Sequence, residues 1–189
     1  MNGDGILALL AAAHIPHDVV RHDAILNVEE GNRLGLPHPE AIAMSLLLCD
    51  DRREHFWLAV IPKDARLDLK ALRARLGSRR LTFASADETQ RLLGLDFGSV
   101  SPFGALNDTA HQIPVLIDAA FEDATIAVPL NTNTATVWLP AHDLAALLRT
   151  RGSQVEFLPL RPAPCRGAFP EEGGSPRVFD WERNGAGAA

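Results

Sequence analysis

The sequence predicts an α+β fold: a mixed, largely antiparallel sheet or partial barrel flanked by helices. A chain of 189 residues is long enough to bury the core of one ordinary domain. Helix and strand patterns interleave in its first half, and closely spaced runs rich in β-branched residues follow before a last helix. This order favours an antiparallel or mixed sheet over a doubly wound parallel one.

Helix signals occur where apolar residues recur at helical spacing next to a cap or a stop residue. Asn27 and Ser85 are the expected N-caps of two segments, and Gly35 and Gly77 are the expected stops of two. The predicted helices are 5–13, 28–34, 66–76, 86–93 and 141–151.

Strand signals are short apolar runs rich in β-branched residues and bounded by turn residues. A polar turn at 50–54 separates two continuous apolar runs, which are expected to pair with each other. The predicted strands are 17–22, 41–50, 55–62, 80–85, 113–121, 125–130 and 134–140.

The composition of the chain changes at Gly152. From there on, five prolines and six glycines accompany only scattered apolar residues. We therefore expect one domain over residues 1–151 and a Pro/Gly-rich C-terminal extension over residues 152–189. The aromatic residues expected to dock this extension are Phe157, Phe169, Phe179 and Trp181.

Charge and composition exclude several classes of function. The formal net charge of −6 argues against a sequence-independent nucleic-acid binder, which normally has a basic surface, and no DNA partner is expected. No apolar run approaches the roughly 20 residues that span a bilayer, so we expect a cytoplasmic protein with no membrane partner. The two cysteines and seven histidines show no metal-ligand spacing, and neither a metal nor a cofactor is expected.

Arginines cluster at Arg73, Arg75, Arg79 and Arg80. The favoured interpretation is a solvated helix face, because runs of charge usually face water. A local basic patch is the alternative, which the net charge of the whole chain leaves open.

The segment DFGSVSPFGALND, residues 96–108, is a candidate binding loop. Glycine lets a ligand approach the backbone closely, and proline fixes the direction of the neighbouring N–H groups. Residues 98–102 can therefore offer backbone amides to a carbonyl or a developing oxyanion. Ser99 and Ser101 would be nucleophiles only with a base in reach, and the sequence identifies none. A plain turn, with hydroxyls that satisfy the loop backbone, is the alternative.

Several short motifs occur in a specific order: Val28-Glu29-Glu30, Leu67-Asp68-Leu69-Lys70, Phe83-Ala84-Ser85, Gly98-x-x-x-Pro102-Phe103-Gly104 and Asn133-Thr134-Ala135-Thr136. With these motifs, residues 5–150 resemble the YbaK and prolyl-tRNA synthetase-associated editing domain family. Within it, the freestanding ProX (PrdX)-like aminoacyl-tRNA deacylases are the most similar branch. The resemblance leaves only the C-terminal extension uncovered.

The resemblance implies a pocket for an aminoacyl group and no metal. Members hydrolyse mischarged tRNA in trans, such as alanyl-tRNA for proline, because small side chains are poorly discriminated by binding alone. The loop backbone binds the ester carbonyl, and the terminal ribose hydroxyl helps to activate water. The implied partners are the tRNA acceptor end, or its aminoacyl group, and prolyl-tRNA synthetase. The implied catalytic residues are Gly98, Ser99, Val100 and Pro102, and the implied substrate-binding residues are Met44, Ser101, Phe103, Asn107, Asp108, Val128, Asn133 and Thr134.

Two polar positions of the family pattern are apolar in this chain. Met44 stands where active relatives have a lysine, and Val128 stands where they often have a histidine. A thioether can supply neither a positive charge nor a hydrogen-bond donor. A catalytically silent or repurposed member, which binds tRNA, an amino-acid-like small molecule or a protein partner, is therefore the alternative to a deacylase.

Overall fold

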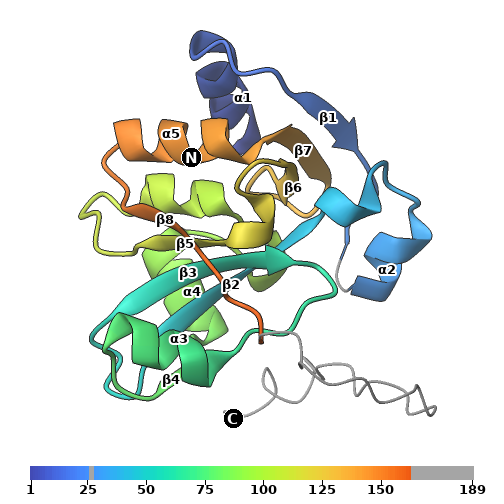
Figure 1. The fold of residues 1–189 in the computed structure, drawn as a ribbon. Coiled ribbons are helices and arrows are strands. Elements are labelled where there is room, and N and C mark those ends of the chain that lie inside the picture. Colours follow the sequence, from blue (N-terminus) through green and yellow to red (C-terminus); the bar gives the residue numbers. More distant parts are fainter. Residues whose placement is uncertain (26–27, 163–189) are drawn as a thin grey trace, which may run out of the picture.

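The computed structural model describes residues 1–25 and 28–162 as two sheets with helices around them (Figure 1). The strands are β1 Asp18–Arg21, β2 Ala43–Asp50, β3 Phe56–Pro62, β4 Leu81–Phe83, β5 Val115–Asp118, β6 Thr125–Pro129, β7 Ala135–Pro140 and β8 Val155–Leu158. The α-helices are α1 Gly3–Ala12, α2 Val28–Arg33, α3 Leu69–Leu76, α4 Ala86–Leu93 and α5 Ala141–Thr150. Short 3-10 helices are η1 Pro39–Ala41, η2 Phe97–Ser99, η3 Pro102–Asn107 and η4 Ala119–Phe121.

The larger sheet has the strand order β4-β2-β3-β5-β8, and the smaller one has the order β1-β7-β6. All pairs are antiparallel except β3 with β5 and β5 with β8, which are parallel. A single bridge between Ile42 and Ala127 connects the two sheets, and the described strands do not close into a barrel. The predicted α+β fold with a mixed, largely antiparallel sheet is confirmed.

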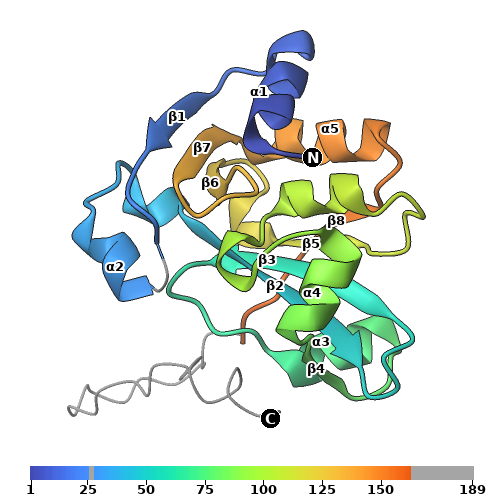
Figure 2. The same ribbon diagram turned by 180° about the vertical axis from the view of Figure 1, so that it is seen from behind.

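The main core lies between the two sheets, with α1, α4 and α5 around it. On β3, Leu58 and Val60 face this core, whereas Ala59 and Ile61 face a second cluster that α3 covers through Leu72. This alternation follows from the two-residue period of a strand, and it explains the continuous apolar runs of β2 and β3, which are buried on both faces. Figures 1 and 2 show α3 and α4 on opposite faces of the larger sheet.

The helices begin and end at the signals present in the sequence. Ser85 forms the expected cap of α4, with a reciprocal bond from the Ser85 N–H to the Glu88 carboxylate, and Gly77 ends α3 with a φ of 59°. The expected cap Asn27 lies outside the described residues. None of the described helices is long and apolar enough to cross a membrane.

The larger sheet extends past residue 151, which corrects the prediction for residues 155–158. These residues were expected in the extension, but they form β8, which pairs in parallel with β5. Leu160 is also buried, and Phe157 packs against the main core, as expected of a docking residue. The sequence hides this strand because Gly152 and Pro159 closely flank a run of only four residues. Phe169, Phe179 and Trp181 lie outside the described residues.

Candidate active site

The segment 96–108 is a compact structure that packs on the main core, not a plain turn. It consists of η2 and η3, and its residues Val100, Phe103 and Ala105 are buried. Gly104 lies so close to Leu95 that a Cβ there would be 2.9 Å from the Leu95 Cδ1 atom. Because these contacts anchor the segment on the main core, the core fixes the position of Gly98.

Ser101 connects this segment to the β6–β7 turn. Its fully buried hydroxyl donates to the Asn131 side-chain oxygen over 2.7 Å and accepts the Phe103 N–H over 3.1 Å. This hydroxyl caps η3, so its proton already has an acceptor other than a catalytic base. The geometry matches the interpretation in which loop hydroxyls satisfy the backbone.

Asn107 and Asp108 hold the end of the same segment. The Asn107 amide donates to the Leu93 carbonyl over 2.6 Å, and its oxygen accepts from the Met1 amino group. Asp108 accepts the Ile113 N–H over 2.8 Å. The side chains of Asn107 and Asp108 therefore hold the C-terminal end of the segment 96–108 in place.

Gly98 is exposed and lies beside the segment that precedes α2. A Cβ built on Gly98 would be 3.7 Å from the Ile25 carbonyl oxygen, an ordinary contact distance. Ile25 in turn donates its N–H to the Asn133 carbonyl over 2.9 Å. Three stretches that are distant in sequence, at residues 22–25, 98 and 133–134, therefore meet at one place.

His22 is a neighbour of this place that the sequence did not single out. Its N–H donates to the Thr134 carbonyl over 3.0 Å, and its Nε2 lies 2.9 Å from the Thr136 hydroxyl. Its Nδ1 lies 2.8 Å from the Asp23 carbonyl, which can only accept, so Nδ1 carries a proton. Sequence reasoning missed His22 because two of its partners, Thr134 and Thr136, are more than 100 residues away.

Met44 and Val128, the two apolar residues at polar positions of the family pattern, have different surroundings. Val128 is fully buried in the main core, on the same side as Val100 and Phe103 of the loop. Met44 is half-buried and packs against the second cluster, on the face of the larger sheet that α3 covers. Its neighbour Ser45 points to the opposite side by strand alternation, and the Ser45 hydroxyl is buried without a partner among the described residues.

The turn of η2 fixes the backbone at Ser99 and Val100. The Ser99 N–H donates to the Asp96 carbonyl over 2.8 Å within the turn of η2. Val100 is only 8% exposed and follows η2 as its C-cap residue.

A separate hollow of about 680 Å³ lies on the outer face of the smaller sheet. Val20 and Trp138 contribute apolar surface to it, and Asp18 and Glu40 add two carboxylates. No residue of 96–108 lines it, and neither do Met44, Val128, Asn133 or Thr134. It is therefore distinct from the place where Gly98, Ile25 and Asn133 meet.

One group of side chains, in the β2–β3 turn, has potential metal-ligand atoms within 4.8 Å of one another: Asp50, Glu54 and His55. The buried Asp50 carboxylate accepts the Glu54 N–H over 2.9 Å, and its other oxygen lies 3.1 Å from the His55 Nδ1 atom. Burial raises the pKa of Asp50, but the hydrogen bonds from Glu54 and His55 outweigh it and lower this pKa below its usual value. These contacts make Asp50 the cap of the turn.

Comparison with known proteins identifies the family to which this chain belongs. The aminoacyl-tRNA editing domain family matches residues 22–147, a range that includes η2, η3, β2 and the β6–β7 turn. The chain belongs to the aminoacyl-tRNA editing domain family. This confirms the family expected from the ordered motifs.

Several relatives of this editing domain match over most of their length. The prolyl-tRNA editing protein ProX of Acetoanaerobium sticklandii is 33% identical over 156 residues, which are 82% of this chain and 95% of that protein. The mouse prolyl-tRNA synthetase associated domain-containing protein 1 is 27% identical, over 76% of this chain and 87% of that protein.

Solved structures share the fold of this editing domain. A candidate trans-editing enzyme for prolyl-tRNA synthetase has a TM-score of 0.64 at 21% identity, covering 85% of this chain and 97% of that one. A hypothetical protein, APE2540, has the same TM-score at 18% identity and covers 79% and 95%.

Proposed function

We propose that this editing domain hydrolyses mischarged aminoacyl-tRNA in trans, with alanyl-tRNA for proline as a substrate. The similarity to the prolyl-tRNA editing protein ProX supports this substrate class. The observation that carries the proposal is the exposed Gly98 on a segment anchored in the main core, beside the place where Ile25 binds Asn133.

Hydrolysis of the ester needs a hydrogen-bond donor next to the ester carbonyl oxygen. Water attacks the carbonyl carbon, and an N–H group of the loop backbone around Gly98 stabilises the negative charge that develops on the carbonyl oxygen. The ribose oxygen then leaves as the hydroxyl of the tRNA. Gly98 lets the aminoacyl ester approach the backbone, and Pro102 fixes the start of η3. Ser101 takes no part as a nucleophile because its hydroxyl is already engaged.

A deacylation assay over a panel of tRNAs charged with alanine, serine, cysteine or proline tests the proposal. We expect turnover of at least one mischarged tRNA for proline. Gly98→Ala keeps every backbone N–H but places a methyl group where the ester would approach, so we expect a loss of about 10²-fold in kcat/KM, as large as that for a lost oxyanion donor. A methyl group fits at Gly98 without a clash, so the loss reports on substrate approach.

Gly31→Ala is the matched control, since its methyl would contact the Ile25 side chain, 3.5 Å from the Cγ2 atom, and not the Ile25 carbonyl oxygen. Full activity of Gly98→Ala would refute the role of the loop. A lack of turnover on every charged tRNA would favour a non-catalytic function.

A binding protein without catalysis is the second function, and the apolar residues Met44 and Val128 favour it. Lys63 does not replace the missing charge freely, because its ammonium group already binds Asp64 over 2.6 Å and Asn32 over 3.0 Å. If the wild type shows no turnover, Met44→Lys distinguishes the two functions. Deacylation by this variant would show that the loop is competent and lacked only a cation. No deacylation by this variant would show that the pocket has diverged more widely.

A further inference from the structure

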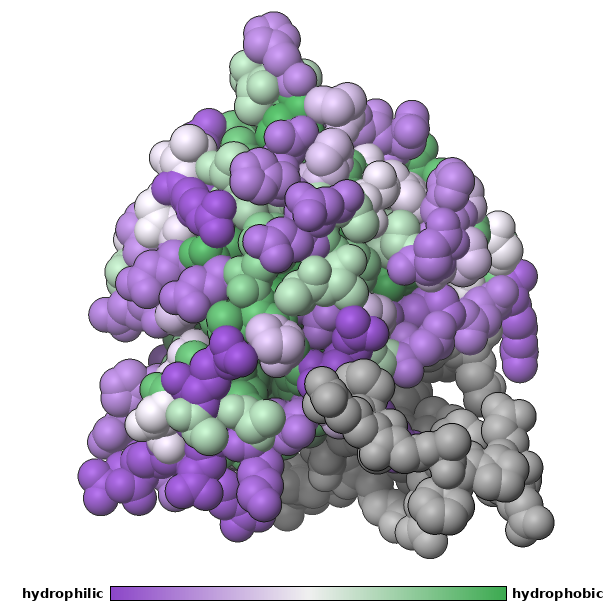
Figure 3. All heavy atoms as spheres, viewed as in Figure 1, coloured by the Kyte–Doolittle hydropathy of each residue, from purple (hydrophilic) through white to green (hydrophobic). Residues whose placement is uncertain are grey.

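The cluster of four arginines lies at one end of the larger sheet, on α3 and on the chain that joins α3 to β4. Arg73 and Arg75 belong to the last turn of α3, and Arg79 and Arg80 come directly before β4. All four are exposed. Figure 3 shows hydrophilic residues gathered over this end of the molecule. We call these four residues the arginine surface.

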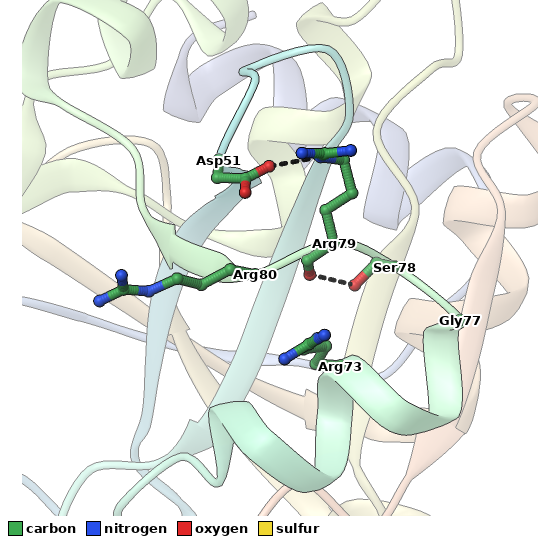
Figure 4. A pocket seen from close by; sticks show the side chains of 6 residues that line it. All are labelled: Asp51, Arg73, Gly77, Ser78, Arg79 and Arg80. Carbon is green, nitrogen blue, oxygen red and sulfur yellow. Dashed lines mark hydrogen bonds and ion pairs between the residues drawn. The ribbon is translucent and has the colours of Figure 1, made fainter.

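The arginine surface surrounds an open hollow of about 360 Å³. Three of its members, Arg73, Arg79 and Arg80, line the hollow together with Ser78 and Asp51 (Figure 4). In this view Arg80 extends away from Arg79, Arg73 lies above α3, and Arg79 turns to Asp51. The hollow therefore combines three guanidinium groups with one carboxylate.

Only one of these cations is neutralised by a neighbour. The Arg79 Nε donates to Asp51 over 2.6 Å, and this hydrogen bond holds the pKa of Asp51 below its usual value. The side chains of Arg73, Arg75 and Arg80 form no ion pair or hydrogen bond with residues 1–25 or 28–162. Unpaired positive charge is thus concentrated in one place on a chain whose net charge is −6.

The helix dipole does not account for the arginine surface. Cations in the last turn of a helix are stabilised by its negative end, which covers Arg73 and Arg75. Arg79 and Arg80 lie beyond Gly77, where the helix has ended, yet they line the same hollow. A second cause is therefore needed for their convergence.

We propose that the arginine surface binds backbone phosphates of the tRNA substrate. This inference rests on the proposed function, and it adds a second contact that positions the acceptor end on the loop. Guanidinium groups bind phosphate oxygens through paired N–H donors, and RNA carries a phosphate at every nucleotide. β4 and the eight residues of α4, about 12 Å long at the usual rise per residue, connect Arg80 to the segment 96–108. Because β4 is an edge strand of the larger sheet, an RNA stem that passes along this edge can contact both.

Titration of labelled, uncharged tRNA at several salt concentrations tests this contact. We expect the double variant Arg73→Ala, Arg80→Ala to bind tRNA more weakly, and the slope of log K against log salt to fall by about 0.7–0.9 for each lost phosphate contact. Arg73→Lys, Arg80→Lys should retain much of the binding, since lysine also binds phosphate as a point charge.

Two controls separate charge from folding. Arg151→Ala removes an exposed arginine at the end of α5, on the opposite side of the molecule from α3, and should leave binding unchanged (Figures 1 and 2). Asp51→Asn frees Arg79 from its partner and should tighten binding, which loss of structure cannot do. With a minimal 3′-aminoacyl adenosine as substrate, the alanine double variant should keep wild-type kcat/KM.

The outcomes distinguish this inference from the proposed function. Deacylation by the wild type, with unchanged affinity and salt slope in the alanine double variant, overturns the arginine surface and leaves the function standing. Weakened tRNA binding by that variant, without deacylation in any protein, supports the surface and refutes the function. Binding of inorganic phosphate but not of tRNA overturns the proposal.

Discussion

At the scale of single residues, Ser101 shows how a polar group fixes the position of the candidate loop. Its hydroxyl makes two hydrogen bonds inside the protein, and one of them reaches Asn131 in another connection. A hydroxyl with both roles filled is a structural group. The exposed Gly98, three residues earlier, owes its fixed place to such contacts.

We predict that Ser101→Ala lowers the free energy of unfolding by about 1–3 kcal/mol, because it leaves the Phe103 N–H and the Asn131 oxygen without this partner. The measurement is urea unfolding of the wild type, Ser101→Ala, Asn131→Ala and the double variant. The two substitutions should show a coupling of about 0.5 kcal/mol or more. Ser99→Ala is the control, since it keeps both bonds of Ser101, and strictly additive effects of Ser101 and Asn131 would contradict the prediction.

The residues of the candidate site differ in how visible they are in the sequence. Gly98 and Pro102 are visible because each restricts the backbone by its own covalent structure. The contacts of Ser101 with Asn131 and of Ile25 with Asn133 are not, because they form between stretches 30 to 108 residues apart. The pairing of the Ser99 N–H with Asp96 was equally hidden, since it depends on the turn of η2.

At the scale of elements, the β2–β3 turn depends on one ionised side chain. Asp50 is 2% exposed and accepts hydrogen bonds from the Glu54 and His55 N–H groups and from the His55 ring. Burial raises its pKa, but these bonds lower it more, so the folded protein binds this proton less readily than the unfolded chain.

We predict that the stabilisation by Asp50 is complete above pH about 4, the ordinary pKa of the unfolded group, and is lost as the pH falls through the lower folded pKa. Asp50→Asn should destabilise the protein by about 1–3 kcal/mol at neutral pH, the range for hydrogen bonds to a charged group. Denaturant unfolding of both proteins between pH 2 and 7 measures the difference. A difference that stays constant down to pH 2 would show that ionisation of Asp50 is irrelevant.

Elements with strong local signals were predictable from the sequence, and those defined by distant partners were not. The α4 helix has its cap, its N3 glutamate and its stop within ten residues, so its position could be predicted. The predicted strand 113–121 is shorter in the structure, because Asp118 caps η4 and ends β5. β8 has no cap or stop of its own, and only its pairing with β5 defines it.

At the scale of the whole molecule, β8 completes the sheet that carries the site. The strand covers an edge of β5, and Val155 contributes to the main core, into which Val100 and Phe103 of the loop also pack. The buried Asp118 at the end of β5 accepts the Leu160 N–H over 3.2 Å and the Arg161 Nε over 3.1 Å. Residues 155–161 are thus bound to the sheet by backbone, apolar and charged contacts.

We predict that a chain ending at residue 151 is destabilised by on the order of 3–6 kcal/mol, because it exposes the apolar surface covered by Val155 and Leu160, each worth about 1.5–3 kcal/mol. A loss of this size is a large fraction of the usual stability of a domain, and the bare edge of β5 would favour aggregation. Thermal unfolding and size-exclusion chromatography compare it with a chain ending at residue 162, which keeps β8, Leu160 and Arg161. Equal midpoints for the two chains would show that the domain is complete at residue 151, and a lower midpoint only for the shorter chain would show that β8 belongs to it.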